Sequence, residues 1–207
     1  IDLKDLPEEL TNGSVNVKFM AAGNDHAVAI DENNEFYFWG NNRLFQDQYE
    51  SNPDLMRALM MDQLEIKQLE ASNQFSAILD TDGNVYLWGN PSITDLECRN
   101  AERETEGMDH APRKYQGNIE KIALTSNTYI SLLKDGTVAY TGLKGDSPLA
   151  GNLPKELTNG SVKVVDIAAS SQAAAAVDET GKVWIWGVAT HGEKNVPEMS
   201  AKPVKLY

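Results

Sequence analysis

Gly-Asn-Asp-His-Ala-Val-Ala-Ile-Asp-Glu-Asn-Asn-Glu-Phe-Tyr-Phe-Trp-Gly, residues 23–40, is the stretch that decides the fold. It contains an apolar run, a polar turn, a second apolar run and a closing Trp-Gly pair. Two short apolar runs on either side of a turn predict a β-hairpin. In the closing pair, the Trp39 ring is large enough to fill a wedge between packed sheets, and Gly40 permits the backbone to turn.

The hairpin recurs three times along the chain. Its repeat cores are residues 17–40, 66–89, 119–142 and 164–187. The closing glycines are 49, 53 and 45 residues apart by their numbers, so the connections vary while the core keeps its length: Gly40, Gly89, Gly142 and Gly187. A period near 50 indicates a repeat architecture. We therefore predict one repeat domain over residues 1–207, with insertions at 41–65 and 90–118.

A second repetition lies upstream of two of these cores. Leu6-Pro7-Glu8-Glu9-Leu10-Thr11-Asn12-Gly13-Ser14-Val15 recurs 147 residues later from Leu153 to Val162, with Lys155 in place of Glu8. We expect the Pro-x-x-hydrophobic part of this segment to be a strand leading into the repeat. Residues 203–206, Pro-Val-Lys-Leu, have the same Pro-x-x-hydrophobic pattern at the equivalent point after the fourth core. The two Asn-Gly pairs predict turns, because both residues tolerate a positive φ.

The repeats resemble those of the regulator of chromosome condensation repeat family. The first half of that motif is best matched by Ala21-Ala22-Gly23-Asn24-Asp25-His26, and the second half by Asp82-Gly83-Asn84-Val85-Tyr86-Leu87-Trp88-Gly89. Some copies depart from the motif: Leu124-Thr125 replaces Ala-Gly, Thr141 replaces Trp, and Ser72 and Ser170 replace glycine. The resemblance implies an all-β fold, a β-propeller in which each repeat supplies one four-stranded blade. His26 occupies a position that the family fills with histidine, which implies a structural hydrogen bond inside the blade.

The number of repeats bears on how the array is completed. Members of that family usually close with seven blades, whereas this chain shows four repeat cores and a further lead-in segment. We predict an incomplete or open propeller, or one completed by another chain or segment. A closed ring of four blades is the alternative, since propellers have about four to eight blades.

Composition limits the classes of partner and compartment. The net charge is -13, with 18 basic and 31 acidic residues. Proteins that grip nucleic acid need clustered Lys and Arg, so the chain is predicted to bind neither nucleic acid nor an anionic membrane. A single cysteine, Cys98, excludes an intrachain disulfide. We see no signal peptide and no apolar run long enough to span a bilayer, which favours a cytoplasmic or virion-associated protein.

The insertions supply the candidate partner-binding residues. In residues 41–65, apolar side chains recur at helical spacing after Ser51-Asn52-Pro53-Asp54, which predicts a short helix. Its apolar side chains either pack on the helix's own blade or form a Met-rich docking ridge for a partner. In residues 90–118 the sequence is long and polar, which is typical of a binding loop or of a mobile connection. As partner contacts we predict Phe45, Tyr49, Met56, Met60 and Tyr115.

Catalytic signals are weak. The three histidines, His26, His110 and His191, lie in different segments and lack metal-ligand spacing. We find no nucleophile elbow, no phosphate loop and no dinucleotide fingerprint. Cys98 lies in an acidic loop, which raises rather than lowers a thiol pKa. The prediction is a protein that is not an enzyme and that uses no cofactor and no metal.

Three functions fit these predictions. The first is a protein-protein interaction module that assembles its contacts from several blades. The second is a structural or decorating component of a virus (phage) particle or a cell surface, in which the chain is part of a larger assembly. The third is guanine-nucleotide exchange on a small GTPase, which the resemblance suggests because the founding member of the family has that activity. We rank it last, because exchange needs a complete ring and an inserted wedge.

Overall fold

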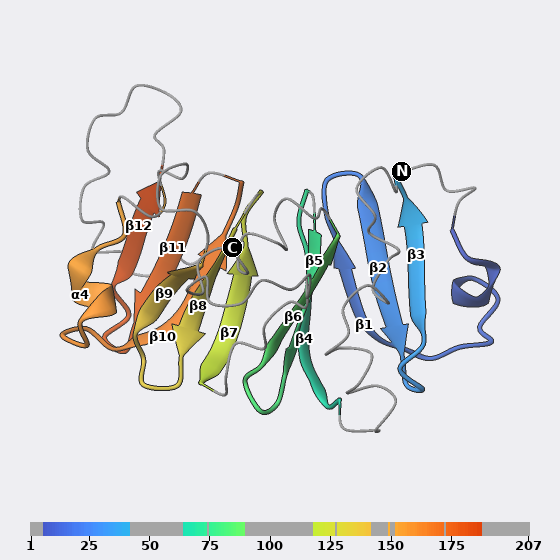
Figure 1. Ribbon diagram of the computed structural model, residues 1–207, viewed down its shortest axis with the longest axis horizontal. Helices are drawn as coiled ribbons and strands as arrows, with labels where there is room; N and C mark the ends of the chain where they lie inside the picture. Colours follow the sequence, from blue (N-terminus) through green and yellow to red (C-terminus); the bar gives the residue numbers. More distant parts are fainter. Residues whose placement is uncertain are drawn as a thin grey trace, which may run out of the picture. The chain divides into compact units, whose positions relative to one another are not determined.

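The computed structural model describes residues 6–41, 64–73, 75–89, 118–126, 128–141, 149, 152–171 and 173–187. The chain divides into two compact units, Ile1–Asn118 and Ile119–Tyr207. Across these described ranges, the strands form four antiparallel sheets of three strands each (Figure 1). The all-β prediction is confirmed. The sheets are separate and none of them closes on itself, which is consistent with an open array.

Each repeat core forms one sheet. The first unit contains the first sheet, β1 (Val17–Ala22), β2 (His26–Asp31) and β3 (Phe36–Gly40), and the second sheet, β4 (Ile66–Ala71), β5 (Phe75–Asp80) and β6 (Val85–Gly89). The second unit contains the third sheet, β7 (Ile119–Leu124), β8 (Tyr129–Leu133) and β9 (Val138–Thr141), and the fourth sheet, β10 (Val164–Ala169), β11 (Ala173–Asp178) and β12 (Val183–Gly187). The predicted hairpin is the second and third strand of each sheet.

The predicted lead-in strand is wrong in both described copies of the Leu-Pro segment. Glu8–Leu10 is a 3-10 helix, η2, and Lys155–Thr158 is a short α-helix, α4. A proline precedes each helix, where its missing N–H costs nothing, and acidic residues occupy the first turn at the positive end of the helix dipole. The segment is therefore a helical turn, and the described part of each sheet has three strands where the resemblance implies four.

The Asn-Gly turns that follow these helices form as predicted. The Ser14 amide donates to Asn12 Oδ1 at 2.8 Å, and the Ser161 amide donates to Asn159 Oδ1 at 2.9 Å. Both glycines of the pairs have a positive φ. The closing glycines behave alike where they are described, with φ of 99° at Gly40, 120° at Gly89 and 127° at Gly187.

A β-bulge at the start of every sheet decides which way its side chains point. The register shifts between the first and third residues of β1, β4, β7 and β10. Without the bulge these two residues would share a face, because strand side chains alternate with a period of two. With it, Val17 and Met20 point to one face of the first sheet, and Phe19 and Ala21 point to the other.

Candidate functional site

The partner contacts predicted from sequence cannot be compared with the structure. Phe45, Tyr49, Met56, Met60 and Tyr115 lie outside the described residues, as does the predicted helix of residues 41–65. Within the part of the chain that is described, no three His, Cys, Asp or Glu residues form a group that could hold a metal ion. No helix among the same residues is long and apolar enough to cross a membrane.

The described residues offer a different site, built from the faces of the sheets. We call the face that carries the first residue of a sheet's first strand its front face, and the opposite face its back face. The strand registers assign Val17, Met20, Tyr37 and Trp39 to the front face of the first sheet. They assign Phe19, Ala21, Val28, Ile30, Phe36 and Phe38 to its back face.

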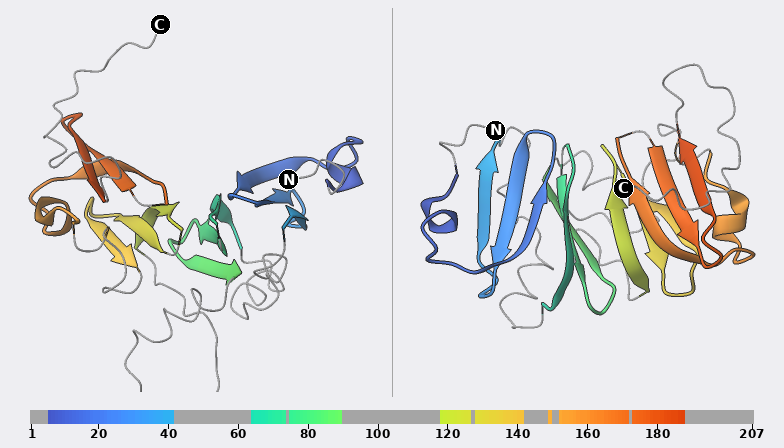
Figure 2. Two further views of the ribbon diagram at one scale, coloured as in Figure 1. Left: turned by 90° about the horizontal axis from the view of Figure 1, so that it is seen from above. Right: turned by 180° about the vertical axis from the view of Figure 1, so that it is seen from behind.

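In the first unit, the second sheet places its front face on the back face of the first sheet. β4 lies beside β1 (Figure 2). The Trp88 ring meets the Phe36 ring edge to face, with centroids 6.0 Å apart and an interplanar angle of 76°. Ile66 and Leu69 join the same apolar cluster, together with Val28 and Ile30 of the first sheet. The Trp88 side chain is 1% exposed, which confirms that this ring fills the space between two sheets.

In the second unit, the fourth sheet packs on the third in the same way. Val164, Ile167 and Trp186 of its front face join one cluster with five residues of the third sheet's back face: Ala123, Ile130, Leu132, Val138 and Tyr140. The helix α4 adds Leu157, which is wholly buried in that cluster. The Val164 amide also donates to the Gly136 carbonyl at 2.9 Å, which ties the start of the fourth sheet to a turn of the third.

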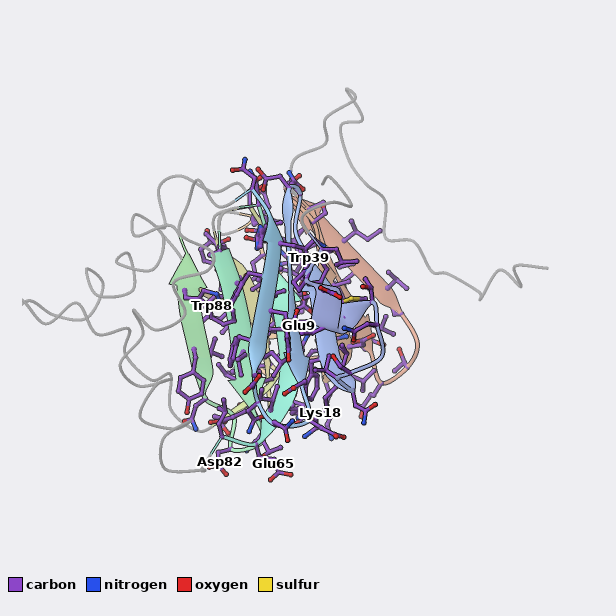
Figure 3. All side chains as sticks on the ribbon, turned by 90° about the vertical axis from the view of Figure 1, so that its right-hand side faces the viewer. Glu9, Lys18, Trp39, Glu65, Asp82 and Trp88 are labelled. Carbon is purple, nitrogen blue, oxygen red and sulfur yellow. The ribbon has the colours of Figure 1, made fainter. Side chains whose placement is uncertain are left out.

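On the front face of the first sheet, Val17 and Met20 are exposed at positions where the second and fourth sheets bury apolar side chains, whereas Ala27 and Ala29 on β2 are buried. Met20 is 69% exposed, whereas its counterparts Leu69 and Ile167 are 7% and 2% exposed. Val17 is 44% exposed, against 3% for Val164. Trp39, on the first sheet in Figure 3, is half-buried. This face is the candidate functional site.

Large exposed apolar side chains on a regular sheet face are informative because such a face normally packs on another element. Single exposed apolar residues are common on protein surfaces, but a group of them points to a contact with another protein. The repeats predict the residue types of each face but contain no signal of which face is exposed, so this site is not predictable from the sequence.

The junction of the first two sheets contains two buried polar contacts. His26 Nε2 lies 3.1 Å from Ser76 Oγ on β5, so its hydrogen bond joins two sheets rather than closing within one as predicted. Burial lowers the pKa of His26, and the nearby Asp25 opposes this shift only partly. A Cβ on Gly23 would lie 1.8 Å from the Ser72 carbonyl oxygen. The motif glycine therefore permits two sheets to approach closely.

A carboxylate organises the turn between the last two strands in three of the repeats. Asp31, Asp80 and Asp178 each accept hydrogen bonds from the turn backbone and from an aromatic donor six residues later: Tyr37, Tyr86 and Trp184. The third repeat has Leu133 in place of the carboxylate and Ala139 in place of the aromatic donor, so it lacks both members of the pair. The pair is not among the residues predicted from sequence, although its spacing of six residues recurs in three repeats.

Burial and hydrogen bonding act in opposite directions on these carboxylates. In Asp178 burial raises the pKa, but donors from Thr180, Trp184 and the Lys182 amide outweigh it and lower the pKa from 3.8 to about 2. The pKa of Asp31 is lowered in the same way, by the Glu35 and Asn33 amides against the effect of burial. These groups serve the fold, since none of their hydrogen bonds leaves its own turn and strand.

Comparison with known proteins identifies the repeat. The model of the regulator of chromosome condensation (RCC1) repeat matches residues 17–46. The chain is similar to yeast RCC1 (Prp20) in its complex with Kap60, at 20% identity and a TM-score of 0.57 over 83% of this chain and 43% of that one. No curated protein sequence matches it.

Two further solved structures are similar. Human WBSCR16 has 18% identity and a TM-score of 0.57 over 83% of this chain and 47% of that one. The C-terminal domain of gp131 from bacteriophage phiKZ has 10% identity and a TM-score of 0.52 over 92% of this chain and 58% of that one. This chain spans less than half the length of the yeast and human structures. Likeness at such identities establishes the propeller-type fold alone.

Proposed function

The chain carries RCC1-type propeller repeats, and from this premise we propose that it is a non-enzymatic protein-binding module that uses the front face of its first sheet. One observation carries the proposal. Met20 is 69% exposed at a position where the second and fourth sheets bury Leu69 and Ile167 against a neighbouring sheet. Covering such a side chain with an apolar partner is favourable by about 25 cal/mol per Å² of apolar surface.

The rest of the chain supports a protein partner over other classes. The net charge of -13 disfavours a phosphate backbone and an anionic membrane. The front faces of the second and fourth sheets each pack on the back face of another sheet, so a front face is suited to contact an apolar protein surface. The insertion residues Phe45, Tyr49, Met56, Met60 and Tyr115 are proposed as additional contacts.

The similar proteins suggest two alternative functions, which we rank below protein binding. Yeast RCC1 (Prp20) was crystallised with Kap60, and another study of Prp20p concerns its binding to Gsp1p and histones. Guanine-nucleotide exchange ranks low for this chain, which covers 43% of that protein. A structural role in a virus particle is the alternative, and the fold of the phage gp131 domain is compatible with it.

Photo-cross-linking in the native cells tests the proposal. We would replace Met20 with p-benzoylphenylalanine, and Glu35 in a matched control, because Glu35 is exposed in the turn of the same sheet. We expect protein adducts from position 20 and few from position 35. The absence of any protein adduct from position 20 would overturn the proposal. Equal adducts from both positions would also contradict it, since they would indicate random collision.

A further inference from the structure

We propose that the front face of the first sheet binds the back face of the fourth sheet of a second copy of this chain. This inference rests on the proposed function, because it names the partner of the same face. It starts from the two sheet-to-sheet interfaces that the chain contains, one in each unit. In both of them a front face is covered by a back face, so the residues of those interfaces define what a front face accepts.

The register gives a back face six positions, of which the first, on the edge strand, is Phe19 in the first sheet and Lys121 in the third. The other five positions are apolar and lie in two rows. In the first sheet these are Ala21, Val28, Ile30, Phe36 and Phe38, and in the third sheet Ala123, Ile130, Leu132, Val138 and Tyr140. Val28, Ile30 and Ile130 are wholly buried, and Leu132 and Val138 are nearly so. A front face in this chain therefore packs on a back face with five apolar positions, and a charged residue is tolerated at the first position, on the edge strand.

The fourth sheet meets this requirement and is exposed. The first position of its back face, on the edge strand β10, is Asp166, which forms an ion pair with Lys121 of β7. The strand register places the five apolar positions in two rows, with Ala168, Ala175 and Ile185 in one and Val177 and Val183 in the other. Ala168 is exposed, Ile185 is 43% exposed, and the remaining three are half-buried. Among the described residues, exposed apolar side chains therefore lie on the front face of the first sheet, at Val17 and Met20, and on the back face of the fourth, at Ala168 and Ile185.

The turn before the last strand of the fourth sheet also has free space around its glycine, unlike the corresponding turn of the third sheet. In the second unit, a Cβ on Gly136 would lie 2.6 Å from Lys163 Cγ, because the fourth sheet begins against that turn. Its counterpart Gly181, also at positive φ, has nothing within 4 Å of a Cβ. Within the second unit, the Val164 amide donates a hydrogen bond to the Gly136 carbonyl. In the proposed interface, the Val17 amide of one copy donates the equivalent hydrogen bond to the Gly181 carbonyl of the other.

The helical turn η2 completes the match. In the second unit α4 contacts β9 and buries Leu157. Leu10 is the counterpart of Leu157 in the nearly identical upstream segment, and it is only half-buried. In the proposed interface, η2 contacts β12 of the second copy and Leu10 becomes buried.

The interface is head-to-tail, since the two copies contribute different surfaces. Such an interface leaves one front face and one back face free in a dimer, so further copies add until a ring closes or a filament forms. A symmetric pair of front faces would bury no back face, and the fourth sheet would stay exposed. This difference makes the proposal testable with two point variants.

Light scattering behind a sizing column tests it on the purified full chain. We expect the wild type to have at least twice the chain mass of 22.8 kDa at micromolar concentration. Met20→Lys and Ile185→Lys should each be monomers, because a charge then lies in the centre of the interface. A mixture of the two variants should form a 1:1 dimer through the one intact front face and the one intact back face. The control, Glu35→Lys, should associate like the wild type.

Several results would overturn this partner. A wild-type chain that is monomeric throughout the micromolar range would do so, and so would a mixture of the two variants that stays monomeric. Both residues are exposed, so circular dichroism should show the same fold and melting temperature for the monomeric variants. If position 20 cross-links to a different protein while the wild type is a monomer, the proposed function stands and the second copy is excluded. If position 20 cross-links to no protein, both fail.

Discussion

Residues 6–40 and 153–187 differ mainly in what covers them. Both regions begin with the same segment apart from Glu8 and Lys155, continue into a three-stranded sheet with the same bulge, and end in Trp-Gly. In the second region Leu157, Val164 and Ile167 are buried against the third sheet, whereas Leu10, Val17 and Met20 in the first are at least partly exposed. Local sequence thus produces the same blade twice, and the neighbouring sheet decides its burial.

The largest expected effect comes from the leucine that the two regions share. Leu157→Ala should lower the free energy of unfolding by about 2–5 kcal/mol, because it leaves a cavity in a closed cluster. Leu10→Ala should cost about 1 kcal/mol or less, because its side chain is half-buried. Urea denaturation measures both, in the Met20→Lys background that keeps the front face uncovered. Equal losses would contradict the comparison by showing that Leu10 is already covered.

A smaller effect is expected at the motif glycine. Gly23→Ala should lower the free energy of unfolding by about 1–3 kcal/mol, since the new Cβ would collide with the Ser72 carbonyl of the second sheet. Ser170→Ala changes the same repeat position in the fourth sheet, where the side chain is exposed, and should be nearly neutral. Thermal denaturation compares the two. A neutral Gly23→Ala variant would show that the first and second sheets do not approach closely in solution.

The turn carboxylates give the smallest expected difference. Asp178→Asn should cost about 1.5 kcal/mol near pH 7, because it weakens hydrogen bonds to a charged acceptor. Asp31→Asn should cost less, because its aromatic donor Tyr37 lies 3.3 Å away, against 3.0 Å for Trp184. Denaturation curves of the wild type and the two variants at pH 7 provide the measurement, and a larger loss at Asp31 would contradict it.

The pH dependence of the same group has a definite sign. The pKa of Asp178 is about 2 in the folded chain and 3.8 in its ordinary state, so its ionised form stabilises the fold fully above about pH 4. This contribution disappears as the pH falls toward 2. Between pH 4 and pH 2 the stability of Asp178→Asn should therefore fall less steeply than that of the wild type. Parallel curves would indicate that Asp178 is not held by these hydrogen bonds.

Much of the fold was predictable, because it depends on local patterns that repeat. The four repeat cores coincide with the four described sheets, and the Trp-Gly pairs at Trp88 and Trp186 bury their rings between sheets. The failure at Pro7 and Pro154 has a local cause as well. A proline followed by glutamates can begin either an extended segment or a helical turn, and the family pattern favoured the wrong one.

The candidate site was less predictable. Strict alternation of side chains along β1 would place Val17 and Phe19 on the same face of the sheet. The β-bulge between them puts them on opposite faces, and a single sequence does not reveal this bulge. The His26 hydrogen bond was expected within a blade, yet its partner Ser76 comes from the next one, 50 residues away. The spacing of Asp31, Asp80 and Asp178 from their aromatic donors recurs in the sequence, so this contact is predictable from the repeats.

The amino-acid sequence by itself determined the number of repeats, the strands of each hairpin, the glycine turns and the apolar character of both sheet faces. These follow from backbone preferences and side-chain alternation, which act over a few residues. Only the tertiary structure decided that Ile167 is buried while Met20 is exposed, and that Leu157 is covered while Leu10 is not. Burial depends on a neighbouring sheet that comes from a distant part of the chain, so two nearly identical segments have different environments.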